Sequence, residues 1–162
     1  MAQVDYFLKL DDVKGESTDD KHKGEIDVES WSWSVTQSGT SGHGAGAGAG
    51  KALPQDFQFS KRFDKASPVL FINSTLGKHF KTAVLTARKA GEGQQEYLTI
   101  TMEDVMVSGY HVSGSAGSDV VPSDQVTLNF AKFEMSYKEQ KADGTLGGEV
   151  KQKYDFAANK KV

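Results

Sequence analysis

The side chains that most often bind metals are poorly arranged for it in this sequence. The four histidines stand at positions 22, 43, 79 and 111, without the H-x-H or H-x-x-x-H spacing that brings two imidazoles onto one ion. Cysteine is absent, so the chain offers neither a thiolate ligand nor a thiol nucleophile. His22 and His43 lie in polar stretches, where we expect water to surround them. The sequence predicts no metal and no other cofactor.

Carboxylates and serines also lack the spacing that catalysis needs. Acidic residues occur as sequence neighbours at 11–12, 19–20 and 103–104, whereas general acid–base catalysis needs carboxylates that face each other across a cleft. The window SGSAG at 113–117 comes closest to the nucleophile motif G-x-S-x-G, but Ser113 stands where its first glycine belongs. We therefore expect a protein that is not an enzyme.

A glycine-rich tract, SGTSGHGAGAGAGK at 38–51, could in principle hold a phosphate. In the P-loop pattern G-x-x-x-x-G-K-[ST], however, Ala45 replaces the first glycine and Ala52 replaces the hydroxyl residue. The looser dinucleotide pattern that ends in alanine matches 42–47, but Pro54 and a strand follow it in place of a helix. Two interpretations stay open: a flexible loop, or a segment that becomes ordered only when a second molecule contacts it.

Serines and tryptophans alternate at 30–34. In a strand, Trp31 and Trp33 point to one side, while Ser30, Ser32 and Ser34 point to the other. The tryptophans are expected in the core. The serines then either face bulk water or line a surface that accepts another molecule.

The elements that carry these residues have mostly the period of two that is typical of β-strands. The clearest strands are expected at 4–10, 26–36, 57–63 and 124–139, and a hairpin at 82–104 turns at AGEGQQ. Changes in the alternation near Glu29 and near 130–132 indicate bulges or bends. Ser67 and Pro68 predict the start of a short helix over 68–76, which Gly77 ends.

Seven to ten strands with one helix predict a mainly β fold, a closed or nearly closed antiparallel barrel or sandwich. The length of 162 residues suits a single domain that spans 1–162. The net charge of −3 indicates neither a nucleic-acid partner nor an anionic membrane. No apolar run is long enough for a membrane span or a signal peptide, so we expect a cytoplasmic protein that can leave the cell only by a leaderless route.

Several short motifs give the chain a specific resemblance. They are VKGES at 13–17, IDV at 26–28, WSW at 31–33, QSG at 37–39, GKH at 77–79, TARKAGEGQQEYL at 86–98, VTLNFA at 126–131 and KADG at 141–144. With these motifs in this order, the chain closely resembles the haemolysin-coregulated protein (Hcp) family. Members of that family form the inner tube of the bacterial type VI secretion system.

The resemblance implies a β-barrel-like pair of antiparallel sheets with one short helix and an extended glycine-rich loop. It implies a homohexameric ring, and rings that stack into a tube inside a contractile sheath, behind a spike trimer. Effector proteins ride in the lumen, and export occurs through the apparatus itself when it fires. The family is not enzymatic by itself, and the ending NKKV leads us to expect no fused effector domain here.

Two sets of residues receive roles from this comparison. Ser32 is expected to contact effectors in the lumen, together with Ser30 and Ser34. The glycine-rich loop is expected to reach from one ring toward the next through Gly42, His43, Gly44, Gly46, Gly48 and Gly50.

Two other functions remain as alternatives. One is a small soluble β-barrel that binds a small molecule or a carbohydrate as a monomer or dimer. The other, ranked third, is a hydrolase. The mass of the native particle separates the first alternative from a ring of six chains.

Overall fold

A computed structural model of the chain describes residues 4–37, 51–89, 93–117 and 121–162. These residues form twelve strands and one helix. Their bounds are β1 Val4–Leu10, β2 Ile26–Val28, β3 Ser30–Ser32, β4 Val35–Gln37, β5 Ala52–Pro54, β6 Phe57–Arg62, α1 Ala66–Leu76, β7 His79–Lys89, β8 Glu96–Ser113, β9 Ser123–Asn129, β10 Lys132–Gln140, β11 Leu146–Asp155 and β12 Lys160–Lys161.

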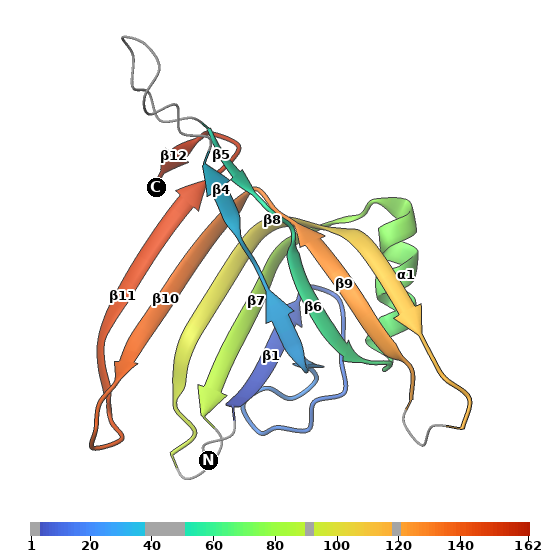
Figure 1. Cartoon of the computed structure of the whole chain (residues 1–162), viewed down its shortest axis with the longest axis horizontal. Helices are drawn as coiled ribbons and strands as arrows, with labels where there is room; N and C mark the ends of the chain where they lie inside the picture. The colour runs from blue at the N-terminus through green and yellow to red at the C-terminus, as the bar shows by residue number, and fades with distance from the viewer. Residues whose placement is uncertain (1–3, 38–50, 90–92, 118–120) are drawn as a thin grey trace.

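The strands close into an antiparallel barrel around the long strand β8. One edge of β8 pairs with β7, which continues to β1 and β2. The other edge pairs with β10 near its start and with β9 near its end, and β9 continues to β6 and β3. Only Glu29 separates β2 from β3, so the circuit closes there. Strands β10, β11 and β12 extend the sheet away from the barrel (Figure 1).

Apolar side chains fill the interior of the barrel, because the inward positions of each strand alternate with polar outward ones. Phe57 and Phe59 of β6 are almost completely buried, as are Leu8 of β1 and Ile100 of β8. The predicted mainly β architecture is confirmed. Side chains therefore fill the interior of this barrel, whereas in some other small β-barrels the interior holds a ligand.

The break in alternation near 130 corrects one expectation. The sequence predicted a single strand over 124–139, whereas the structure has two, β9 and β10. Between them Phe130 turns into the core and the N–H of Ala131 donates to the carbonyl oxygen of Glu103. Opposite this crossing, Asp104 of β8 has a φ of 55°. The chain thus changes position along one edge of β8, because β9 pairs with the second half of β8 and β10 pairs with the first half.

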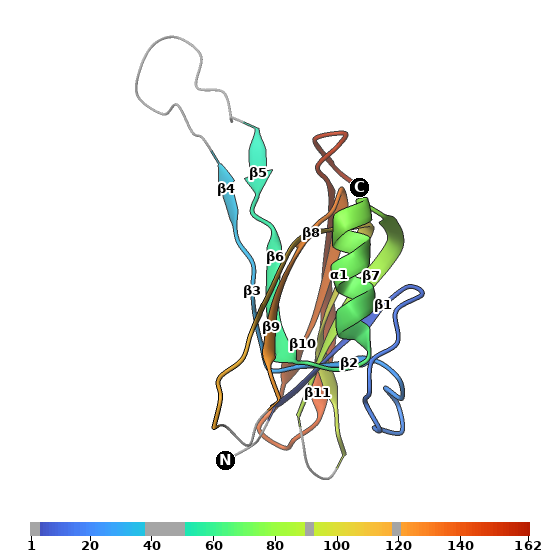
Figure 2. The ribbon, with the colours of Figure 1, turned by 90° about the vertical axis from the view of Figure 1, so that its right-hand side faces the viewer.

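Helix α1 packs against one side of the barrel (Figure 2) and begins earlier than predicted. Ser67 is not the N-cap; it lies in the first turn, and the N–H of Ala66 donates to the Asp64 carboxylate at 2.9 Å. The predicted end is confirmed, because Gly77 adopts the left-handed conformation with φ 64°. None of the helices in the described ranges is long and apolar enough to span a bilayer.

His22 corrects another expectation, because it is buried and not surrounded by water. Its ring stacks on Phe7 with centroids 4.4 Å apart, and its two nitrogens lie 2.6 Å from carboxylate oxygens of Glu25 and Glu96. These contacts fasten the long loop after β1 to the start of β8. His43 lies outside the described residues.

Candidate functional site

The predicted serine face is part of a larger polar surface on the outside of the barrel. Ser30 lies opposite Ser60 of β6, and Ser32 lies opposite Gln58. The same register continues into β9, where Gln125 faces Ser60 and Thr127 faces Gln58. Three strands far apart in sequence therefore present one continuous row of hydroxyl and amide groups. We call this surface, formed by Ser30, Ser32, Gln58, Ser60, Gln125 and Thr127, the polar face.

A shallow depression of about 160 Å³ lies on the polar face, and its floor includes Trp31 and Phe59. The hydroxyls of Ser30 and Ser60 are hydrogen-bonded across it at 2.5 Å. All of its lining side chains are uncharged. Charged side chains lie beside the depression but not in it. Arg62 and Glu29 form an exposed ion pair at 3.3 Å, and the Asp56 carboxylate accepts a hydrogen bond from the Ser108 hydroxyl at 2.6 Å.

The two tryptophans anchor the polar face to the core, as predicted. Trp31 stacks on Phe57 with centroids 5.7 Å apart. Trp33 packs edge-on against Phe133 at 4.9 Å, and its indole N–H donates to the carbonyl oxygen of Gln55 at 3.0 Å. These contacts fix the backbone of β3, and thereby the direction in which the serines point.

Ser34 does not belong to the polar face that contains Ser30 and Ser32. It follows β3 at the base of the two-stranded ribbon β4–β5, where its carbonyl oxygen accepts from the N–H of Gln55 at 2.9 Å. The ribbon projects beyond the barrel (Figure 2). The glycine-rich tract that joins its strands, from Gly42 to Gly50, lies outside the described residues.

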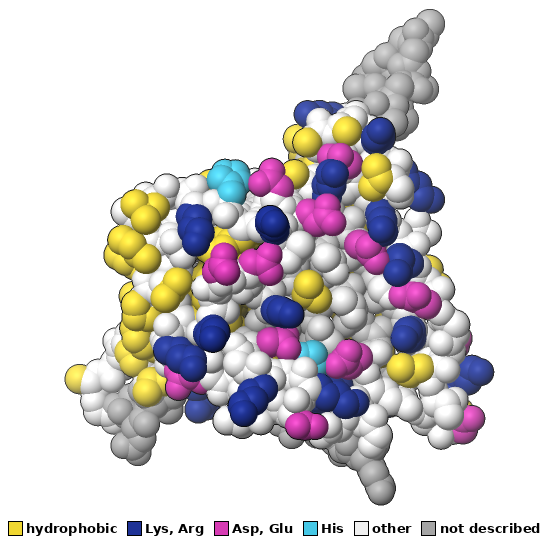
Figure 3. Space-filling model, turned by 180° about the vertical axis from the view of Figure 1, so that it is seen from behind, with side chains coloured by type: hydrophobic (Ala, Val, Ile, Leu, Met, Phe, Trp, Pro, Cys, Tyr) yellow, Lys and Arg dark blue, Asp and Glu magenta, His cyan; other side chains and the backbone are white. Residues whose placement is uncertain are grey.

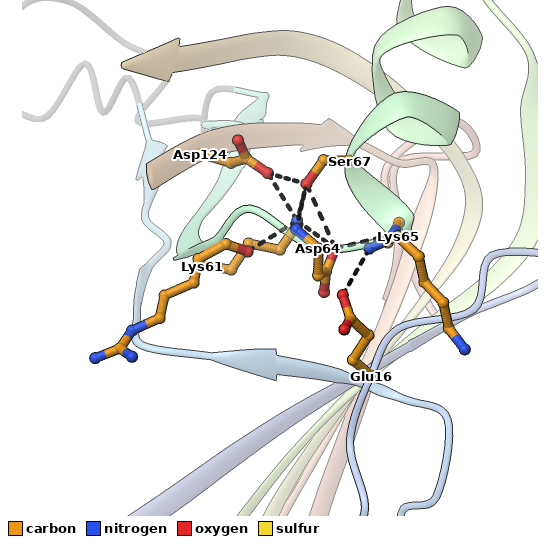
Figure 4. Close-up of polar contacts among 8 residues, drawn as sticks. Glu16, Lys61, Asp64, Lys65, Ser67 and Asp124 are labelled. Carbon is orange, nitrogen blue, oxygen red and sulfur yellow. Dashed lines mark hydrogen bonds and ion pairs between the residues drawn. The ribbon is translucent and has the colours of Figure 1, made fainter. Parts of the chain in front are cut away.

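A buried ion-pair cluster holds the polar face to helix α1 (Figure 4). Lys61 follows Ser60 on β6 and points inward, with its Nζ 2.7 Å from Asp124 of β9 and 2.8 Å from Asp64. The same ammonium donates to the Ser67 hydroxyl at 2.6 Å. Lys61, Ser67 and Asp124 are each 0% exposed. The cluster therefore ties two strands of the polar face to the first turn of the helix.

This cluster combines a serine, a lysine and an aspartate, which are the residue types of nucleophilic catalysis. Its complete burial leaves no path by which a substrate could reach the Ser67 hydroxyl. Burial, and then the nearby Asp124 carboxylate, raise the pKa of Tyr110 to about 12. The phenol is uncharged at physiological pH with or without this shift, so it adds no charge to the cluster. The burial of Ser67 indicates a structural role for the cluster.

The opposite side of the molecule is highly charged, with basic and acidic side chains interspersed (Figure 3). Some of them form cross-strand pairs on β10 and β11, such as Glu134 with Lys151 and with Lys153, both at 3.1 Å. Elsewhere Arg88 binds Asp19 through two hydrogen bonds, and this guanidinium holds the pKa of the Asp19 carboxyl well below its usual range. The barrel thus has one neutral polar face and one charged face.

Sequence reasoning identified Ser30 and Ser32 but did not assign their partners on β6 and β9. The alternation of Phe57 and Phe59 with Gln58 and Ser60 places those two polar residues on the outside. It does not reveal that β6 pairs with β3. That pairing joins segments far apart in sequence, and a single sequence contains no local signal for it.

The fold and these surfaces define a small antiparallel β-barrel protein whose faces differ in their chemistry. A family model described as "Type VI secretion system effector, Hcp" matches residues 7–137. Protein hcp1 of Pseudomonas aeruginosa is 54% identical over 158 residues, which cover 96% of this chain and 97% of that protein.

Solved structures agree with this match. The crystal structure of Hcp1 from Salmonella typhimurium is 37% identical with a TM-score of 0.83, and 100% of each chain is covered. A structure described as a type six secretion system protein is 30% identical with a TM-score of 0.93, and 99% of this chain and 100% of that one are covered. The chain belongs to the Hcp family of type VI secretion proteins.

Proposed function

We propose that six copies of this chain form a ring and that the rings stack into the propelled inner tube of the type VI apparatus. In this proposal the barrel acts as one structural unit that is not an enzyme. Its partners are further copies of itself, the contractile sheath, the spike trimer and effector proteins. Family membership supports the assembly, and the neutral polar face supports the contact with cargo.

The polar face suits a lumen that must hold a protein weakly and release it. Hydroxyl and amide groups can both donate and accept hydrogen bonds, so they match many cargo surfaces. Each such bond contributes only about 0.5–1.5 kcal/mol, because water competes for the same groups. The lining of the depression is uncharged, so it would favour neither acidic nor basic cargo. Ser32 is our first choice for a cargo contact, followed by Ser30 and then Ser34.

The experiment changes the polar face without touching the core. Ser32 is exposed, so Ser32→Gln should leave folding and hexamers intact in sedimentation. The longer side chain would cover the depression and reduce the amount of effector that co-purifies. Thr18→Gln, at an exposed loop position away from the polar face, is the matched control. Unchanged effector retention in Ser32→Gln would exclude this residue as a contact.

A further inference from the structure

Helix α1 has a composition that is unusual for a helix on a protein surface. Its sequence ASPVLFINSTL contains no charged residue, whereas a solvated helix normally carries charges on its outer side. Of its large apolar side chains, only Leu70 is fully buried. Phe71 is 56% exposed, Ile72 is 48% exposed and Leu76 is 70% exposed. We call these three residues the helix patch.

A second apolar surface lies on β10 and β11. Tyr137 and Val150 are directly opposite each other in the antiparallel register, and they are 45% and 62% exposed. Tyr137 also lies opposite the half-buried Leu98 of β8. We call Leu98, Tyr137 and Val150 the strand patch.

The strand patch is a continuation of the barrel core. Along β10, Phe133 and Met135 pack against the core, and Tyr137 follows them with the same alternation. The residues between them, Glu134 and Ser136, point to the charged side. The core face of the sheet therefore extends past the part that the subunit itself covers.

The two patches lie at opposite ends of the molecule. In Figure 1 helix α1 is at the far right, and β10 and β11 are at the far left. In Figure 3, which shows the reverse side, hydrophobic side chains gather at the edge where α1 lies. Exposed apolar clusters of this kind mark places where proteins associate.

We propose that the helix patch of one copy packs on the strand patch of the next copy. The inference rests on the proposed ring and assigns the surfaces that build it. Two unlike patches at opposite ends of one subunit make a head-to-tail contact, and such a contact forms a closed ring when the rotation between subunits closes. The occupant is a second copy because each patch supplies the apolar partner that the other lacks.

The test uses one charged substitution in each patch. Leu76→Arg places a cation at the C-terminal end of the helix, where the helix dipole favours it, so the subunit should fold. Val150→Arg changes an exposed strand position, where the long stem of the arginine can lie along Tyr137. We expect native mass spectrometry to show a loss of hexamers in both variants, while circular dichroism and unfolding curves stay like those of the wild type.

Mixing the two variants provides the specific readout. Each variant keeps the patch that the other has lost, so one contact can form between them and no further copy can add to it. At high concentration the mixture should contain heterodimers, and neither variant alone should contain dimers. Folded variants that remain hexameric, or a mixture without heterodimers, would overturn the assignment.

A control separates this inference from the proposed ring. Lys9→Glu alters an exposed residue of β1, outside both patches, and should leave hexamers intact. If the wild type and Lys9→Glu form hexamers and Leu76→Arg does too, the ring stands and the patches are wrong. If the wild type itself never forms a hexamer, the proposed function fails first.

Discussion

At the scale of single residues, Lys61 places a buried charge where β6, β9 and the start of helix α1 meet. Its ammonium is completely buried and lies within hydrogen-bonding distance of two carboxylates and a hydroxyl. A buried charge is tolerated only when its partners are in place, and removal of one partner leaves the other charge uncompensated. Lys61 alternates with Ser60, so the same strand presents the polar face on one side and its support on the other.

We expect Lys61→Met to lower the free energy of unfolding by about 3–5 kcal/mol, because the Asp124 carboxylate would stay buried without its cation. The double variant Lys61→Met/Asp124→Leu removes the two fully buried charges and should recover part of that loss, because Asp64, whose side chain is 13% exposed, still loses its cation. Chemical denaturation at matched protein concentration measures both effects.

The next residue in the chain supplies the control. Arg62 forms an exposed ion pair with Glu29, with side chains 69% and 52% exposed, so Arg62→Met should cost only about 0–1 kcal/mol. If Lys61→Met proves no more destabilising than Arg62→Met, the cluster does not hold β6 and β9 to the helix.

At the scale of elements, the sequence predicted features that depend on residues close together in the chain, such as helix ends and hairpins. It did not predict contacts between segments far apart in the chain. Gly77 ends the helix as predicted, because a left-handed glycine is a local signal. The hairpin of β7 and β8 is also confirmed. Lys61 and Asp124 stand 63 positions apart, so no local pattern could reveal their pairing or the burial of a lysine.

The serine face could be predicted only in part for the same reason. The alternation at 30–34 indicated which side Ser30 and Ser32 occupy. Ser34 separates from them because β3 ends at Ser32 and the chain continues into the ribbon β4–β5. Ser32 pairs with Gln58 near the beginning of β6, so the end of β3 depends on where its antiparallel partner begins, and the sequence of β3 alone does not contain that information.

The ribbon leads to our prediction for ring stacking. Deletion of 41–49 should leave hexamers intact, because β4 and β5 would still be joined by the residues that flank the deletion. We expect stacking of the rings to weaken, since the glycine-rich tract is our candidate for the contact between rings. Electron microscopy of concentrated protein measures tube length. Tubes as long as those of the wild type would exclude the tract from stacking.

At the scale of the whole molecule, the barrel separates its surfaces by chemistry. A neutral polar face covers β3, β6 and β9, a charged face lies on the opposite side, and two apolar patches lie at the ends. The net charge of −3 per chain leaves only modest repulsion between copies. In the proposed ring the apolar patches are buried between subunits, the polar face lines the channel and the charged face points outward.

Native mass spectrometry of the purified 162-residue chain tests the ring most directly. We predict a particle of six chains, each of 17.6 kDa, over a wide range of protein concentrations. A particle of one or two chains at every concentration would contradict the proposed ring and would favour a small binding module instead.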